Sequence, residues 1–148
     1  MRALLIIFLV SISSTYAQQI DYNIKKGFVA NGYDVVAYFN NEAIEGSKNF
    51  TVEFNGVKFK FFTQNNLDIF KISPHKYIPQ YGGYCAYAIA EKGEKVSINP
   101  ETFEIRDGKL YLFYNAWGTN TLKLWLKNNV KGLQEKGDKN WEDLKYMD

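Results

Sequence analysis

The stretch FTVEFNGVKFKFF, residues 50–62, decides the fold of this chain, because it predicts a β-hairpin. Asn55 and Gly56 stand at its centre, and both residues of a type I′ turn need the positive φ that Asn and Gly tolerate best. Charged and apolar residues alternate on either side of the turn, as a half-buried antiparallel ribbon requires. The pairs expected outward from the turn are Phe54 with Val57, Glu53 with Lys58, and Val52 with Phe59.

A second hairpin is predicted in ETFEIRDGKLYLFY, residues 101–114, where Asp107 and Gly108 supply the turn. Two such ribbons indicate a small antiparallel sheet. The pairs expected across the second ribbon are Ile105 with Leu110 and Phe103 with Leu112.

Helical segments are predicted between the two hairpins. The first begins near Gln64 with Thr63 as its N-cap, and it carries Leu67 and Phe70 on one side. Pro74 is expected to break this helix or to restart it as a second turn, because proline disrupts a helix interior.

The segment YCAYAIAEKG, residues 84–93, predicts a further helix after two consecutive glycines. Its alanines favour helix, and Gly93 is a suitable C-cap. Cys85 is expected in the first turn, with Ala88 and Ile89 on its face.

The strongest helical pattern is NTLKLWLKNNVKGLQEKG, residues 120–137, with Asn120 as the cap and Gly137 as the stop. The residues that follow are expected to add a final turn that packs Trp141 and Leu144 onto the domain. An apolar stripe at helical spacing is expected to form a core face. Its members are Leu122, Trp125, Leu126, Val130 and Leu133.

Helices packed on hairpins are typical of an α+β domain. We expect two antiparallel β-hairpins that form a small sheet, packed with several short helices and one longer C-terminal amphipathic helix. No repeat, low-complexity tract or linker divides residues 18–148, so they are predicted to form one domain.

The first 17 residues have the pattern of a secretory signal peptide. Arg2 precedes the apolar run ALLIIFLVSI, and Thr15 and Ala17 are the small residues expected before a cut. Cleavage after Ala17 predicts a periplasmic or secreted protein. The apolar run is short and has no stop-transfer charges behind it, so no stable membrane span is expected once the signal is removed.

Charge and cysteine content narrow the classes of function. The formal net charge is +2, with acidic and basic residues interspersed, which predicts no binding of nucleic acid. The single cysteine, Cys85, has no partner for an internal disulfide. It is therefore a buried inert thiol, an intermolecular bridge, or a reactive or metal-binding group.

A catalytic thiol is disfavoured by the surrounding sequence. A helix N-terminus would favour the thiolate of Cys85. A cysteine hydrolase also needs a base, however, and His75 is the sole histidine of the chain. The GGYC sequence matches neither common cysteine-hydrolase motif. We therefore assign no catalytic residue.

Metal binding is open only to a soft ion. One cysteine and one histidine exclude a closed structural zinc site. Copper(I) accepts few ligands, so Cys85 with His75, or the Cys85 thiols of two chains in a homodimer, suffice. Met147 is the remaining thioether of the mature chain. The predicted metal residues are Cys85 and His75, with copper or another soft metal as the ion.

Four tyrosines surround the thiol in sequence. They either pack their rings in the core or line a small aromatic pocket for an apolar ligand, and the sequence leaves both open. They are Tyr77, Tyr81, Tyr84 and Tyr87.

The segment FNGVKFKFFTQNNLDIFKISPHKYI, residues 54–78, resembles the YHS domain family, in which an aromatic-Gly hairpin runs into a helix and then a Pro-x-Lys-Tyr turn. The segments GYDVVAYF, PQYGGYCAYAIA and DGKLYLFYN are similar to an exported branch of that family. The resemblance covers most of residues 18–148 and implies the YHS fold. The matching residues are Phe54, Gly56, Phe59, Phe61, Phe70, Pro74, Lys76 and Tyr77.

The metal-binding version of the family carries three thiols that this chain lacks. The resemblance places Ala37, Phe62 and Asn66 at those positions. Any metal is therefore expected at Cys85, which belongs to the exported branch. His75 stands where the family shows an acidic residue, so the resemblance does not make it a ligand.

Three hypotheses for function follow. The first is an exported YHS-like accessory module that binds copper or another soft metal through Cys85. The second is a thiol-dependent redox protein or enzyme in which Cys85 forms transient mixed disulfides. The third is a non-catalytic ligand-binding or structural scaffold with Cys85 in its core.

Overall fold

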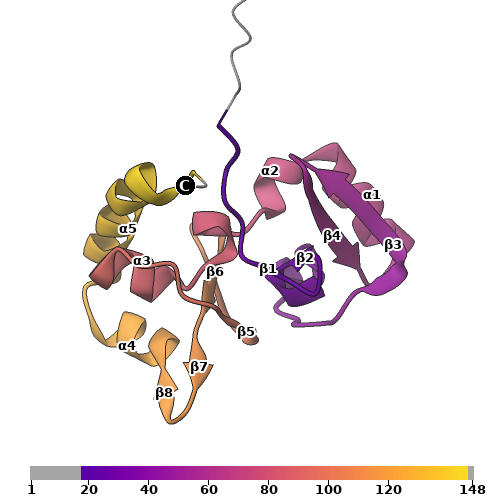
Figure 1. The fold of residues 1–148 in the computed structure, drawn as a ribbon. Helices are drawn as coiled ribbons and strands as arrows, with labels where there is room; N and C mark the ends of the chain where they lie inside the picture. The colour runs from indigo at the N-terminus through magenta and orange to yellow at the C-terminus, as the bar shows by residue number, and fades with distance from the viewer. Residues whose placement is uncertain (1–17, 147–148) are drawn as a thin grey trace, which may run out of the picture.

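The computed structural model describes residues 18–146. The predicted signal peptide, residues 1–17, and Met147 lie outside the described residues. Figure 1 shows two halves with the N-terminal segment running between them. Strands β1 to β4 pack with α1 and α2 on one side, and β5 to β8 pack with α3, α4 and α5 on the other.

The α+β class is confirmed. The described residues contain five α-helices and four two-stranded antiparallel sheets. The helices are α1 (Gln64–Ile72), α2 (Pro74–Tyr77), α3 (Ala86–Lys92), α4 (Thr121–Lys127) and α5 (Val130–Leu144). The hairpins are β1 (Ile24–Lys25) with β2 (Phe28–Val29), β3 (Ser47–Phe54) with β4 (Val57–Phe61), β5 (Asn99–Arg106) with β6 (Lys109–Phe113), and β7 (Asn115–Ala116) with β8 (Thr119–Asn120). Three 3₁₀ turns are η1 (Ala30–Gly32), η2 (Ala37–Asn40) and η3 (Gln80–Gly83).

Both predicted hairpins have the expected turns and registers. Asn55 and Gly56 have φ values of 51° and 76°, and Asp107 and Gly108 have 52° and 69°. Local turn chemistry therefore sets the pairing of the long ribbons. The predicted pairs are all present, from Phe54 with Val57 to Val52 with Phe59, and from Ile105 with Leu110 to Phe103 with Leu112.

The prediction that the two hairpins share one sheet is wrong. Ribbons β3–β4 and β5–β6 are separate two-stranded sheets. Cys85 forms a parallel bridge with Leu112, on the edge of β6 that faces away from β5. Because this edge is already occupied, β6 is not free to pair with a strand of the other ribbon.

Helices α1 and α2 begin, and α3 ends, at the predicted residues. The Thr63 hydroxyl accepts a hydrogen bond from the Asn66 N–H at 3.1 Å and caps α1, and Pro74 starts α2. Helix α3 ends at Gly93, which has a φ of 65°. Capping side chains and glycine are local features, which is why the sequence reveals these ends.

The predicted helix over residues 120–137 is two helices. Asn128 is extended, and the Asn129 side chain accepts from the Gly132 N–H at 3.2 Å, so a new helix, α5, begins at Val130. Asparagine side chains bond to nearby backbone groups and so compete with a continuous helix. The prediction that Gly137 ends the helix is wrong, because α5 continues to Leu144. Gly137 instead lies against Tyr81, whose hydroxyl oxygen would be 2.6 Å from an added Cβ.

The break changes which residues of the predicted stripe face the core. Trp125 and Leu133 are buried, and Leu122 and Val130 pack at the edge of the core. Leu126 is exposed, contrary to the prediction. Trp141 and Leu144 pack against the same core, as expected, but as part of α5.

Strand β6 separates two hydrophobic cores. Leu110 and Leu112 belong to the first core, which includes Phe59, Phe61 and Phe70 of the N-terminal half. Tyr111 and Phe113 belong to the second core, which includes Ile89, Trp125 and Leu133. Side chains alternate across a strand, so one strand supplies both cores.

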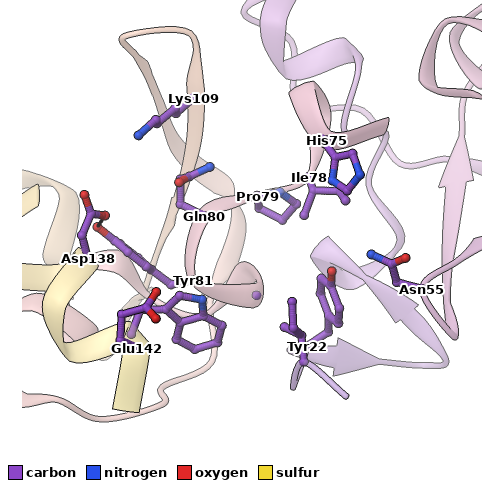
Figure 2. A pocket seen from close by; sticks show the side chains of 13 residues that line it. Tyr22, Asn55, His75, Ile78, Pro79, Gln80, Tyr81, Lys109, Asp138 and Glu142 are labelled. Atoms are coloured by element: carbon purple, nitrogen blue, oxygen red, sulfur yellow. Dashed lines mark hydrogen bonds between the residues drawn. The ribbon is translucent and has the colours of Figure 1, made fainter. Parts of the chain in front are cut away.

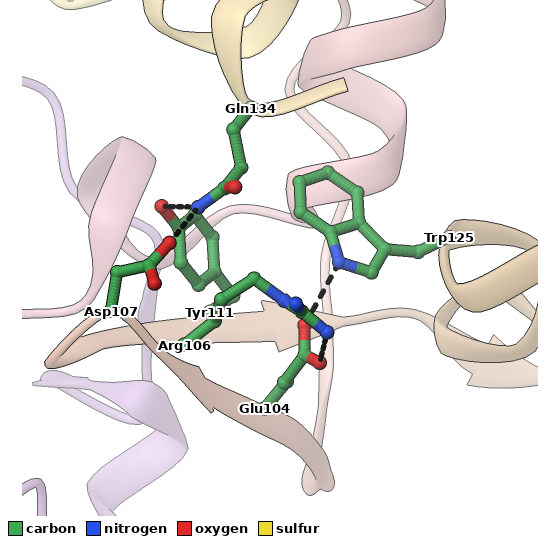
Figure 3. Close-up of polar contacts among 6 residues, drawn as sticks. All are labelled: Glu104, Arg106, Asp107, Tyr111, Trp125 and Gln134. Carbon is green, nitrogen blue, oxygen red and sulfur yellow. Dashed lines mark hydrogen bonds and ion pairs between the residues drawn. The ribbon is translucent and has the colours of Figure 1, made fainter. Parts of the chain in front are cut away.

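A polar network ties the second core to the β5–β6 ribbon. The Trp125 Nε1–H donates to Glu104 at 2.9 Å, and Glu104 also pairs with Arg106 (Figure 3). The Gln134 amide donates to the Tyr111 hydroxyl at 3.0 Å. These contacts hold α4 and α5 on one face of the ribbon.

The Asp34 carboxylate organises the N-terminal half. Asp34 is fully buried, and its Oδ1 accepts from the N–H groups of Val36 at 2.9 Å and Ala37 at 3.2 Å. Its Oδ2 accepts from the Phe62 N–H and from the Asn66 side-chain amide, both at 2.8 Å. Four donors compensate the buried charge and fix η2 against the start of α1.

The turn η3 joins the two halves through left-handed backbone. Tyr81, Gly82 and Gly83 have φ values of 54°, 60° and 80°. A Cβ atom on Gly82 would lie 2.3 Å from the carbonyl oxygen of Asp21. The N-terminal segment is therefore in close contact with this turn, and the Asn23 N–H donates to the Gly82 carbonyl at 2.9 Å.

The close approach at Gly82 predicts a large effect of Gly82→Ala. Left-handed strain and the clash with Asp21 together are expected to lower the free energy of unfolding by roughly 3–5 kcal/mol. Gly108→Ala is the matched control, because Gly108 also has a positive φ but has open space within 4 Å of the position that an added Cβ would take. The control is expected to lose about 1–2 kcal/mol. Urea unfolding followed by circular dichroism measures both, and equal losses would contradict the role of the contact.

Candidate binding site at Cys85

Cys85 connects η3 to α3 and is fully buried. It is the N-cap residue of α3, one position before the first helical turn in which it was expected. Its backbone N–H donates to the Val96 carbonyl at 2.9 Å. The residue also forms a parallel bridge with Leu112, and its backbone, with a ψ of 113°, is not helical, so α3 begins at Ala86.

The thiol has partners for both its donor and its acceptor. The Tyr114 N–H donates to Sγ at 3.4 Å, and Thr121 Oγ1 lies 3.2 Å from Sγ. The Thr121 hydroxyl donates its single proton to the Tyr114 carbonyl at 2.8 Å, so it accepts from the thiol. The hydrogen-bonding capacity of the thiol is therefore used within the protein.

A pocket of about 390 Å³ adjoins this thiol. Thr121 and Cys85 contribute polar atoms to its inner wall, and Lys92 lies at the exposed side of α3. Cys85 has no exposed surface, so the sulfur forms part of the wall without facing bulk solvent. The remaining lining is mainly apolar and comprises Tyr87, Ala88, Val96, Tyr114, Thr119 and Leu124.

His75 lies in a different pocket. It is exposed on α2, and its ring stacks edge-on against Phe54 with 5.3 Å between ring centroids. It lines a pocket of about 380 Å³ between the two halves, which Cys85 does not line (Figure 2). The structure therefore does not bring the two predicted metal residues together. Within residues 18–146, no group of three or more His, Cys, Asp or Glu side chains is placed to hold a metal ion.

The two carboxylates that line the pocket between the halves already have partners. The Tyr81 hydroxyl donates to Asp138 at 2.9 Å, and Glu142 pairs with Lys145. Burial, and then the charge of Asp138, raise the pKa of Tyr81. A tyrosine that remains neutral and bonded to Asp138 suits a structural contact between η3 and α5.

The four tyrosines near Cys85 have separate environments. Tyr77 packs edge-on against Phe39 at 5.0 Å, and Tyr81 belongs to the second core. The half-buried Tyr84 donates to Asp21, and Tyr87 lines the Cys85 pocket. They therefore do not form one aromatic pocket, and three of them serve packing or hydrogen bonding.

The positions that the YHS resemblance assigns to thiols converge in space. Ala37, Phe62 and Asn66 all donate hydrogen bonds to the carboxylate of Asp34. Two of these contacts are made by backbone N–H groups, those of Ala37 and Phe62, and the third by the side-chain amide of Asn66.

Several residues of the Cys85 pocket were not predicted from the sequence. Thr121 lies within the predicted helix over residues 120–137 and Tyr114 within the predicted hairpin over residues 101–114, and neither was predicted to contact Cys85. The sequence shows that a threonine lies at the start of the helix. It does not show that this threonine is buried against Cys85, because that contact depends on how α4 and β6 pack. The other unpredicted lining residues are Lys92, Val96, Thr119 and Leu124.

Comparison of this chain with protein-family models, curated proteins and solved structures gives no match. Among residues 18–146, no helix has both the length and the apolar character to cross a membrane.

The environment of Tyr84 predicts a pH dependence of stability. Burial, followed by the hydrogen bond and the charge of Asp21, raises the pKa of Tyr84 to about 12 in the folded protein. Because this value lies above that of an unfolded tyrosine, about 10, the contribution of Tyr84 to stability is complete below pH 10 and is lost as the pH rises through 12. The stability advantage of the wild type over Tyr84→Phe is therefore expected to shrink from pH 9 to pH 12. Urea unfolding across this range measures it, and a constant difference would contradict the assignment.

Proposed function

We propose that this protein is an exported YHS-like binding domain whose ligand site is the pocket beside Cys85. The observation that carries the proposal is a mainly apolar cavity with polar atoms at its inner wall and one lysine at its side. Cavities with apolar walls and a few polar anchors are typical of small-molecule sites.

The lining favours a small organic anion with an apolar body. Tyr87, Val96 and Leu124 offer apolar surface for the body of the ligand. Lys92 is available for its charge, because no ion pair involves Lys92 among residues 18–146. Monocarboxylates of aromatic or short aliphatic acids have this chemistry.

The state of the thiol favours binding over turnover. Cys85 is bonded to Tyr114 and Thr121, and His75 lines another pocket. Cysteine hydrolases use a base that is hydrogen-bonded to the thiol, and neither hydrogen-bond partner of the Cys85 sulfur is a base. The role proposed for Cys85 is therefore to complete the inner wall of the pocket.

Membership of the YHS family is proposed from the resemblance of the sequence segments. The three positions that the resemblance assigns to thiols contact Asp34 through the backbone N–H groups of Ala37 and Phe62 and the side-chain amide of Asn66. Ala, Phe and Asn stand at the positions where the metal-binding version of the family has thiols. This favours a member of the family that does not hold metal at that place. Export is proposed from residues 1–17 alone.

Ligand binding is tested with small carboxylates and their neutral amides. Phenylacetate is expected to bind the purified protein at least tenfold more tightly than phenylacetamide in isothermal titration calorimetry, because Lys92 pairs with the carboxylate. Lys92→Gln is expected to remove this preference. Lys71→Gln is the matched control, since Lys71 is also exposed and unpaired among residues 18–146 but lies on α1. Equal affinity for both probes, or no binding across a series of aromatic and aliphatic acids, would refute the proposal.

The copper hypothesis is tested separately. Copper(I) is titrated into the protein with a competing chelator, for the wild type and for Cys85→Ser. We expect no stoichiometric binding that depends on Cys85, because its sulfur is buried and bonded and His75, the predicted second ligand, lines another pocket. Binding of one equivalent per chain or per pair of chains, lost in Cys85→Ser, would instead establish the soft-metal function.

A further inference from the structure

Trp117 is an exposed tryptophan at the tip of the β7–β8 hairpin. The residue is 96% exposed, the highest value among the large apolar residues of the described chain. Figure 1 shows this hairpin projecting at the lower edge of the C-terminal half. An indole in this position contributes no packing to the fold.

The backbone at Trp117 is unfavourable for this residue type. Its φ is 52°, and Gly118 follows at 75°. The other three hairpins place a polar residue at the same turn position, before a glycine, and these residues are Lys26, Asn55 and Asp107. Trp is therefore present where a polar residue would serve the turn better, and an outlier that the fold does not explain points to a function.

The sequence around this hairpin is basic. No acidic residue occurs between Asp107 and Glu135. The lysines in this interval are Lys109, Lys123, Lys127 and Lys131.

Helix α4 presents two of these lysines to solvent. Trp125 is buried, so helical geometry places Lys123 and Lys127 on the opposite, outward face. Leu124 and Leu126 flank them and are 36% and 51% exposed. The outward face of α4 thus combines cationic and apolar side chains beside the hairpin.

The acidic residues of the neighbouring strand β5 neutralise little of the positive charge of Lys123 and Lys127. Strand β5 contacts both β7 and α4. It carries Glu104, which is paired with Arg106 and bonded to Trp125, and the exposed Glu101. The net charge of the surface remains positive.

We propose that Trp117 and the outward face of α4 form a surface that binds anionic phospholipid headgroups. The indole enters the headgroup layer, where tryptophan is favoured, and Lys123 and Lys127 pair with lipid phosphates. A projecting side chain suits a fluid surface that yields to it, whereas a folded protein partner would need a pocket shaped for the ring. The protein is thereby held at a membrane surface without spanning it.

The proposal is tested by co-sedimentation of the full chain with vesicles, using variants that all share residues 1–17. Vesicles of phosphatidylcholine with phosphatidylglycerol are expected to bind the wild type at least tenfold more tightly than vesicles of phosphatidylcholine alone. Trp117→Asn is expected to weaken this binding at least tenfold while leaving thermal stability unchanged or higher, because Asn-Gly suits the turn. Lys26→Asn, at the same position of the β1–β2 turn, is expected to bind as the wild type does.

The contribution of Lys123 and Lys127 is tested against a control variant that loses the same number of positive charges elsewhere. The double variant Lys123→Gln with Lys127→Gln is expected to bind roughly tenfold or more weakly to the anionic vesicles. Lys48→Gln with Lys71→Gln removes two exposed lysines from the other half and is expected to have little effect. Unchanged binding by Trp117→Asn, or equal binding to both kinds of vesicle, overturns the proposal. Self-association in the absence of lipid that Trp117→Asn abolishes also overturns it and assigns the surface to a second copy of the chain.

Discussion

The burial of both faces of β6 is the constraint on which this structure depends. Leu110 and Leu112 enter one hydrophobic core and Tyr111 and Phe113 enter the other, and all four are fully buried. A shift of the strand by one residue would exchange leucines for aromatic rings in both cores at once. The strand is therefore fixed in register more strongly than a hairpin with one solvated face, and both halves of the molecule pack against it.

Strand β6 positions the candidate site through its C-terminal end and through the edge that faces away from β5. Cys85 bridges to Leu112 on that edge, and the residue that follows the strand, Tyr114, directs its N–H to the sulfur. The Tyr114 carbonyl holds the Thr121 hydroxyl, which completes the surroundings of the thiol. The register of β6 therefore fixes the positions of the residues that form the inner wall of the pocket.

Local features account for the parts of the fold that were predictable. Asn55 and Asp107 before glycines, the Thr63 cap and Gly93 act within a few residues, so the sequence reveals two hairpins and the ends of two helices. The long helix was predicted wrongly because its apolar spacing continues through two asparagines whose side chains break it. The site was predicted only at Cys85, Tyr87 and Ala88, since most of its other residues come from segments that meet through packing.

The sequence by itself determined the α+β class, the registers of the long hairpins and the presence of one thiol behind a glycine pair, because turn and capping preferences are encoded over short distances. Only the tertiary structure decided that Cys85 is buried and bonded and that His75 lines a different pocket. It also decided that the hairpins remain separate sheets and that Trp117 projects into solvent. The physical reason is that burial and proximity depend on contacts between residues far apart in the chain, which no local pattern specifies.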